Sequence, residues 1–161
     1  GTIQAGVIGN EGERTPDLSM SFMWNSKKNI AGYGGHVFSS SGSSGAGIHG
    51  SMSPHEMKNI LFATGPSFKT GIAIDHPSGN VDLTPTILTI LGISTDAKMD
   101  GRSLSEALIN GPDHKTLQWS SEFHTAERSI ETCLYRQQVT TAKIGTTTYI
   151  DEGMATRETL K

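Results

Sequence analysis

The sequence has few cysteines, no long apolar run and no basic stripe, three features that would indicate a disulfide-bonded, membrane-spanning or nucleic-acid-binding protein. Cys133 is the only cysteine, so no disulfide can form within the chain, and cysteine usage says little about compartment. No apolar run approaches the ~20 residues of a membrane-spanning helix, so we expect no membrane span. A basic stripe is also missing, and the formal net charge is −3 at pH 7. Binding to nucleic acid through neutralisation of its phosphates is therefore not expected.

Apolar residues are scarce as well. They make up 34% of the 161 residues, below the ~45–50% that is usual for globular domains. The length suffices for one domain with a core, but 19 glycines and many serines and threonines indicate a loop-rich chain or part of a larger body. We interpret residues 1–161 as a single partial domain, with residues 1–50 as a loop-rich lead-in and residues 51–161 as a regular α/β part.

Apolar patterning predicts two strands and one helix. Leu18–Trp24 alternates apolar and polar residues, which predicts a strand with one apolar face. The short apolar run Ile60–Ala63 predicts a buried strand. Leu83–Leu91 has helical periodicity, with Asp82 placed to cap its start and Gly92 to end it.

Two capping boxes predict further short helices. In the first, Ser53 is the N-cap, Pro54 takes the first helical position and Glu56 follows three residues after the cap. The second, Ser103–Glu106, opens a helix that should stop at Gly111.

β-branched and aromatic residues dominate from residue 117 onward. They predict a hairpin of Val139–Ile144 and Thr146–Ile150 that turns at Gly145. Strands and helices in this arrangement indicate the α/β class.

A histidine between glycines is the most informative local feature. In Gly45–Pro54, the bare flanks Gly47 and Gly50 allow a sharp turn and leave the His49 ring room to contact a neighbouring group. The pattern by itself also fits a histidine that is merely hydrogen-bonded in a glycine turn. An apolar run closed by Gly-Pro follows within Ile60–Lys69.

Six segments form an ordered series: Gly45–Pro54, Ile60–Lys69, Ser78–Thr86, Leu88–Gly92, Met99–Leu104 and Thr146–Gly153. This series resembles the alkaline phosphatase superfamily, and most closely its type I phosphodiesterase/nucleotide pyrophosphatase branch. The similarity extends over roughly residues 45–110 and, more weakly, 135–153. No single motif is decisive, and the order of the series makes the resemblance specific.

The resemblance implies a fold, a cofactor and a substrate class. The fold would be the C-terminal part of an alkaline-phosphatase-like three-layer α/β/α sandwich. His49 would be one ligand of a site for two divalent ions, two zinc ions in the complete parent enzyme. The parent would hydrolyse small phosphate esters or nucleotides, and the family points to a periplasmic or secreted enzyme.

Other parts of such a site are missing from the sequence. The family nucleophile is a Thr or Ser in an upstream loop, and further ligands come from an upstream Asp and an Asp-His-Gly motif. Here Ile48 precedes the only His-Gly pair, His49-Gly50, and Asp75-His76 is followed by Pro77, which fits a loop better than a ligand pair. We therefore expect a C-terminal fragment of a metal-dependent phosphoric ester hydrolase, without a catalytic residue and inactive alone.

Two alternatives stay open. A sulfatase-like sulfuric ester hydrolase of the same superfamily would share these motifs, although the Gly65–Lys69 turn favours a phosphodiesterase. The chain could also be a non-catalytic remnant. The upstream nucleophile separates the enzymes, because a Cys indicates a sulfatase and a Thr or Ser a phosphodiesterase.

The other candidates have plainer interpretations. His36 follows two glycines, His55 falls in the first capped turn and should face solvent, and His114 and His124 fit surface-loop and strand positions. Cys133 has no nearby histidine in sequence, so we expect a buried structural thiol. The sequence leaves the oligomeric state open.

Overall fold

The computed structural model describes residues 2–9, 11–38 and 49–160 of the chain. It is a mixed α/β structure with a three-stranded antiparallel sheet and few helices, which confirms the predicted α/β class at this coarse level. The chain divides into two compact units, and each is described by itself. None of the helices in these ranges is long and apolar enough to cross a membrane.

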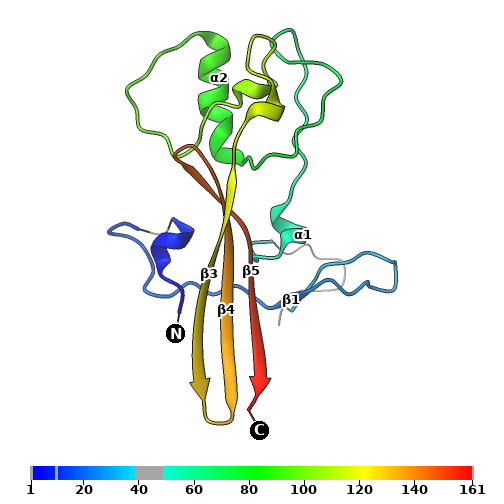
Figure 1. Ribbon diagram of the computed structural model, residues 1–161, viewed down its shortest axis with the longest axis vertical. Coiled ribbons are helices and arrows are strands. Elements are labelled where there is room, and N and C mark those ends of the chain that lie inside the picture. The colour runs from blue at the N-terminus through cyan, green and yellow to red at the C-terminus, as the bar shows by residue number, and fades with distance from the viewer. Residues whose placement is uncertain (1, 10, 39–48, 161) are drawn as a thin grey trace. The chain divides into compact units, whose positions relative to one another are not determined.

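Unit 1 comprises Gly1–Asn59, Glu122–Thr141 and Ile150–Lys161. Its front part is mostly irregular, as the glycine and serine content predicts (Figure 1). Its regular elements are short: the 3-10 helix η1 (Ala5–Ile8), the strands β1 (Trp24–Asn25) and β2 (His36–Val37), and the helix α1 (Pro54–Met57). β1 and β2 pair antiparallel, with Trp24 opposite Val37.

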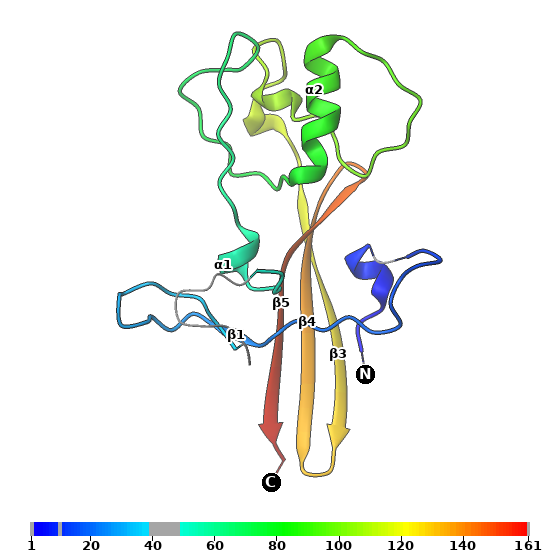
Figure 2. The same cartoon turned by 180° about the vertical axis from the view of Figure 1, so that it is seen from behind.

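The three-stranded sheet has the order β3 (Ser120–Ile130), β4 (Cys133–Ile144) and β5 (Thr147–Thr159), as Figure 2 shows from behind. Both connections are two-residue turns whose first residue has a positive φ, 53° at Glu131 and 58° at Gly145. The hairpin predicted around Gly145 is therefore confirmed. Its strands are longer than predicted, and β3 adds a third strand.

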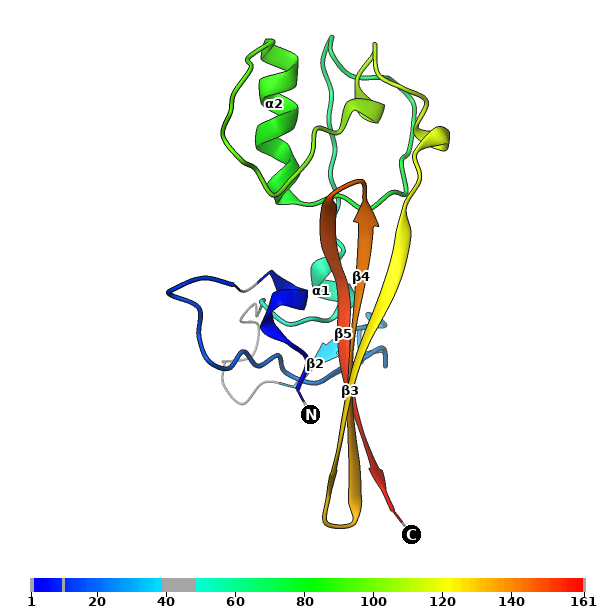
Figure 3. The same cartoon turned by 60° about the vertical axis from the view of Figure 1, so that its left-hand side comes forward.

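Unit 2 comprises Ile60–Ser121 and Ala142–Tyr149. It contains the helix α2 (Leu83–Leu91) and three short 3-10 helices, η2 (Asn80–Asp82), η3 (Ser105–Ala107) and η4 (His114–Thr116). Figure 3 shows α2 beside the loops of this unit. The predicted helix and its end are confirmed, because the Gly92 N–H bonds back to the carbonyls of Leu88 and Thr89.

Both strands predicted from apolar patterning are wrong. Only Trp24 of Leu18–Trp24 lies in a strand, and Met20 is 85% exposed. Ile60–Ala63 is irregular, and Phe62 is 89% exposed. A strand needs a neighbour for its backbone groups, and in residues 2–9, 11–38 and 49–160 no strand lies beside Ile60–Ala63.

The capping predictions are confirmed in part. Ser53 caps α1, since its hydroxyl accepts from the His55 N–H at 3.3 Å. Glu56 does not complete the box, because its carboxylate accepts instead from the Ser51 N–H at 2.9 Å. The second box is wrong: η3 is a single 3-10 turn without a side-chain cap. The Asp82 side chain does not cap α2 either, because other donors occupy its carboxylate.

Candidate functional site

The structure places His49 on the surface of unit 1. Gly50 has a φ of 95°, which side-chain-bearing residues rarely adopt, so the glycine on this side of His49 is required by the backbone. Gly47 and the rest of Gly45–Ile48 lie outside the described residues.

The segment that follows His49 is held firmly. Ser51 and Ser53 are buried, and the Ser51 N–H bonds to the Glu56 carboxylate at 2.9 Å. The Ser51 hydroxyl also accepts from the Ser53 N–H at 3.2 Å. These bonds fix the turn that leads into α1, so His49 stands directly before an ordered anchor.

A metal centre is not complete in the part of the chain that the structure describes. No group of three or more His, Cys, Asp or Glu side chains there could hold a metal ion. Zinc sites use three or four protein ligands, whereas the described residues contribute the single imidazole of His49 to the implied site. The donor type fits zinc, and the donor number does not.

The other two histidines of the front part have ordinary surroundings. His55 is exposed, as predicted, and its ring meets the edge of Trp24 at a centroid distance of 6.0 Å. Its Nε2 lies 3.2 Å from the Ser26 hydroxyl. His36 is exposed in β2, opposite Asn25.

A buried carboxylate organises unit 2. The side chain of Asp82 is fully buried, at 0% exposure. It accepts hydrogen bonds from the Gly79 N–H at 2.9 Å, the Arg102 N–H at 2.8 Å and the Tyr149 hydroxyl at 3.0 Å. Three donors satisfy a charge that would otherwise be costly to bury.

Arg102 extends this network. Its guanidinium donates two hydrogen bonds to Glu106, at 2.9 and 2.7 Å, and one from Nε to the Tyr149 hydroxyl at 3.1 Å. Burial opposes the charge of Glu106, but the bonds from Arg102 hold its pKa below the ordinary value. Burial and the hydrogen bond to Asp82 raise the pKa of Tyr149 to about 12.

The local sequence patterns do not predict this network. Asp82 and Glu106 carry the local signature of helix caps, and nothing in the local pattern indicates that Arg102 and Tyr149 reach them. A weak signal was available, since an arginine four residues before a glutamate can pair with it. Because the donors and acceptors are mutually occupied and sheltered, the network acts as a structural brace.

The remaining candidates do not assemble into a catalytic site. His76 lies near Glu106 and His114, with 6.4 Å between the two imidazole centroids, and its Nδ1 is buried without a hydrogen-bond partner. His124 lies in β3 and contacts the Thr141 hydroxyl at 3.0 Å. Cys133 is only half-buried, so that prediction is wrong.

Arg157 explains the position of this thiol. Both Nε and Nη2 of Arg157 lie 3.2 Å from the Cys133 sulfur. Cys133, which makes these two contacts with Arg157 on the sheet surface, is therefore not the buried structural thiol that the sequence predicts.

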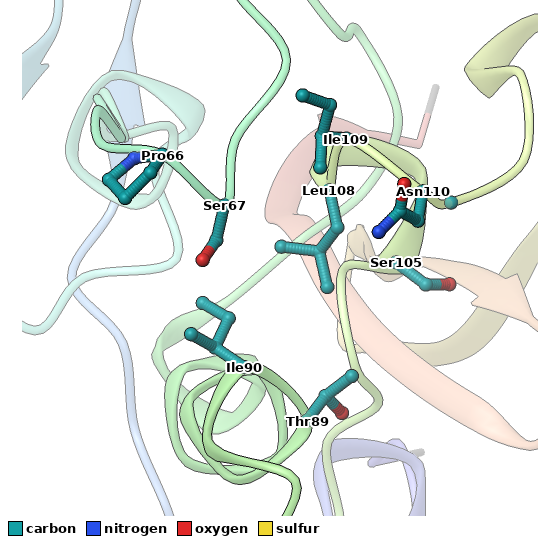
Figure 4. A pocket seen from close by; sticks show the side chains of 9 residues that line it. Pro66, Ser67, Thr89, Ile90, Ser105, Leu108, Ile109 and Asn110 are labelled. Carbon is teal, nitrogen blue, oxygen red and sulfur yellow. The ribbon is translucent and has the colours of Figure 1, made fainter.

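A shallow hollow of unit 2 lies between α2 and the turn after η3 (Figure 4). The side chains of Ile90 and Leu108 point into it, and Ser67 and Asn110 stand at its border. Its lining residues are uncharged, so this hollow offers no general acid, general base or metal ligand.

Comparison with known proteins adds no assignment. No protein-family model matches the chain, and no solved structure matches it at a significant level.

Proposed function

We propose that the chain is the C-terminal portion of a metal-dependent phosphoric ester hydrolase of the phosphodiesterase/nucleotide pyrophosphatase type. One observation carries the proposal. Three of the segments that resemble this family, Ser78–Thr86, Met99–Leu104 and Thr146–Gly153, supply Asp82, Arg102 and Tyr149, and these three side chains meet in one buried network. These three segments resemble the family only by their order along the chain, yet their side chains form one hydrogen-bonded network. Such a shared network is expected if the segments belong to one structural unit of the family.

Exposed apolar residues support the wider fold proposal, an α/β/α sandwich of which this chain forms part. Ile60 and Phe62 are 80% and 89% exposed, and Ile87 and Leu91 of α2 are 53% and 63% exposed. Exposed apolar side chains that gather into a patch mark a surface that another body covers. In a complete sandwich the remaining strands would cover these side chains.

In this proposal His49 is one ligand of a two-zinc site. The bound ions would activate the nucleophile, hold the phosphoryl oxygens and neutralise the leaving oxygen. His49 would supply a neutral imidazole nitrogen, and Gly50 and the anchored Ser51–Glu56 turn would fix the direction of its ring. The nucleophile and the other ligands would come from outside this chain, and the substrate would be a small phosphate ester or a nucleotide.

Two substrates distinguish this proposal from a sulfatase. The full-length protein that carries this chain should hydrolyse bis(4-nitrophenyl) phosphate with added Zn²⁺, and 4-nitrophenyl sulfate much more slowly. The isolated 161-residue chain should show only background rates with both, because it contributes one ligand and no nucleophile. Preferential sulfate hydrolysis would assign the parent to the sulfatase alternative. Turnover by the isolated chain that is lost in His49→Ala would refute the proposal that the chain lacks a nucleophile.

A further inference from the structure

The two edge strands of the sheet differ in how their outer sides are occupied. Segments of unit 1 contact β5 at Gly153, whose N–H donates to the Met52 carbonyl at 2.8 Å and whose carbonyl accepts from Trp24 Nε1 at 2.6 Å. β3 lies at the opposite edge (Figures 1 and 2), and β4 is the one strand among the described residues that pairs with it. Within the described ranges, no backbone hydrogen bond joins residues 122–130 to a segment outside the sheet.

An edge of this kind is a template for pairing with another strand. β3 is eleven residues long, and all its residues except His124 and Ala126 are exposed. It contains no proline, the residue that most directly prevents a strand from being extended. Charged side chains are what protects β3 from pairing with another strand. The same charges can select which strand pairs with it.

Three charged side chains lie on β3. Glu127 already forms an ion pair with Arg136 of β4 in the same chain. Within the described part of the chain, Glu122 approaches one imidazole, that of His124, at 4.0 Å, and Arg128 makes no ion pair there. Glu122 and Arg128 therefore remain as an exposed acid and an exposed base on one strand. Because six positions separate them, both point to the same face of the sheet.

Charge complementarity selects a second copy of this strand and a single register. Two copies of one strand pair antiparallel about a two-fold axis perpendicular to the sheet, and residues of the same face then oppose each other. When Thr125 opposes Thr125 of the second copy, Glu122 opposes Arg128 of that copy, and symmetry forms this pair twice. Registers centred on Glu127 or Arg128 set like charges against each other, which is unfavourable.

We propose that two copies of this chain associate through β3 into a continuous six-stranded antiparallel sheet, centred on Thr125 and fixed by reciprocal Glu122–Arg128 pairs. The second copy supplies backbone partners for the open edge, and the two ion pairs favour this register over the neighbouring ones, in which Glu122 and Arg128 do not oppose each other. This interaction surface is independent of the hydrolase proposal, since it uses residues 122–130 of unit 1 and neither His49 nor a metal ion.

Charge reversal tests the proposal on the 161-residue chain by sedimentation velocity at micromolar concentrations and low salt. The wild-type chain should form dimers. Glu122→Arg and Arg128→Glu should each weaken the dimer about tenfold or more, because each turns two attractive pairs into two repulsive ones. The double variant Glu122→Arg/Arg128→Glu should restore the dimer to within a few-fold of the wild type. Asp96→Lys and Lys98→Glu, exposed charge reversals in unit 2, are the matched controls and should leave it unchanged.

A chain that stays monomeric at 100 µM (on the order of the concentrations at which weak dimers populate) would overturn the proposal. So would a dimer that resists both single reversals, since association would then use another surface, such as the exposed apolar residues of Ile60–Ala63. Failure of the double reversal to rescue the dimer, with circular dichroism unchanged, would refute the reciprocal register.

Discussion

The Tyr149 hydroxyl donates a hydrogen bond to the carboxylate of Asp82, 67 residues earlier in the chain, at 3.0 Å. Asp82 is fully buried and Tyr149 is 8% exposed, so water does not readily replace either partner. Arg102 completes the triangle from a third segment. Unit 2 thus has a polar centre in place of a large apolar core, in keeping with the low apolar content of the sequence.

Tyr149→Phe should destabilise unit 2. The change leaves the Asp82 carboxylate without one of its donors at nearly constant side-chain volume, which should cost about 1–3 kcal/mol. Amide hydrogen exchange locates the effect, because the Gly79 and Arg102 N–H groups bond to the same carboxylate and should exchange faster. Tyr33→Phe, at a 74% exposed position, is the matched control. Unchanged exchange at Gly79 and Arg102 in Tyr149→Phe would contradict the bracing role.

The free energy of unfolding should fall at alkaline pH because Tyr149 ionises. Its pKa in the folded chain is raised to about 12, above the ordinary 10.0, mainly by burial. Between pH 10 and pH 12 the folded state therefore keeps the Tyr149 proton that the unfolded chain loses. The stabilisation that Tyr149 contributes is intact below pH 10 and is lost as the pH rises toward 12. The loss should reach up to about 2 kcal/mol.

Tyrosinate absorbance measures this ionisation directly. An ionisation step near pH 12 should be present in the wild type and missing in Tyr149→Phe. An unfolding free energy whose change between pH 10 and pH 12 is the same in both proteins would contradict the assignment.

Glu131→Gly should stabilise the sheet. Glu131 is the one described non-glycine residue with a positive φ, 53°, and it begins the β3–β4 turn. Glycine adopts this conformation without strain, so the replacement should gain about 0.5–1 kcal/mol in urea unfolding despite its entropy cost. Glu131→Ala removes the same charge but keeps the strain, and it should give no gain. Equal effects of the two substitutions would attribute the change to charge.

The sequence predicted those elements whose signals are local. The helix Leu83–Leu91 has its period, its early proline and its terminal Gly92 within ten residues, and the hairpin turns at one glycine. The strands predicted at Leu18–Trp24 and Ile60–Ala63 are wrong because a strand also requires a neighbouring strand, which its own residues do not specify. The brace was missed for a related reason, since Arg102 lies 20 residues from Asp82 and 47 from Tyr149.

The position of the candidate metal ligand was only partly predictable. Glycine beside His49 and the Ser53 cap are local features, and the structure agrees with both. The other ligands of a zinc site come from distant loops, so one histidine motif indicates where an ion could bind and not which side chains complete its coordination.

The metal content of the full-length protein tests the central proposal most directly. Elemental analysis after dialysis against a limiting chelator should give about two zinc ions per wild-type chain, as a two-metal site requires. His49→Ala should lose at least one ion together with most phosphodiesterase activity, because the change opens a coordination position and frees the ion to move. His36→Ala, at an exposed position in β2, should retain both. Full zinc content and full activity in His49→Ala would contradict the assignment of His49 as a metal ligand.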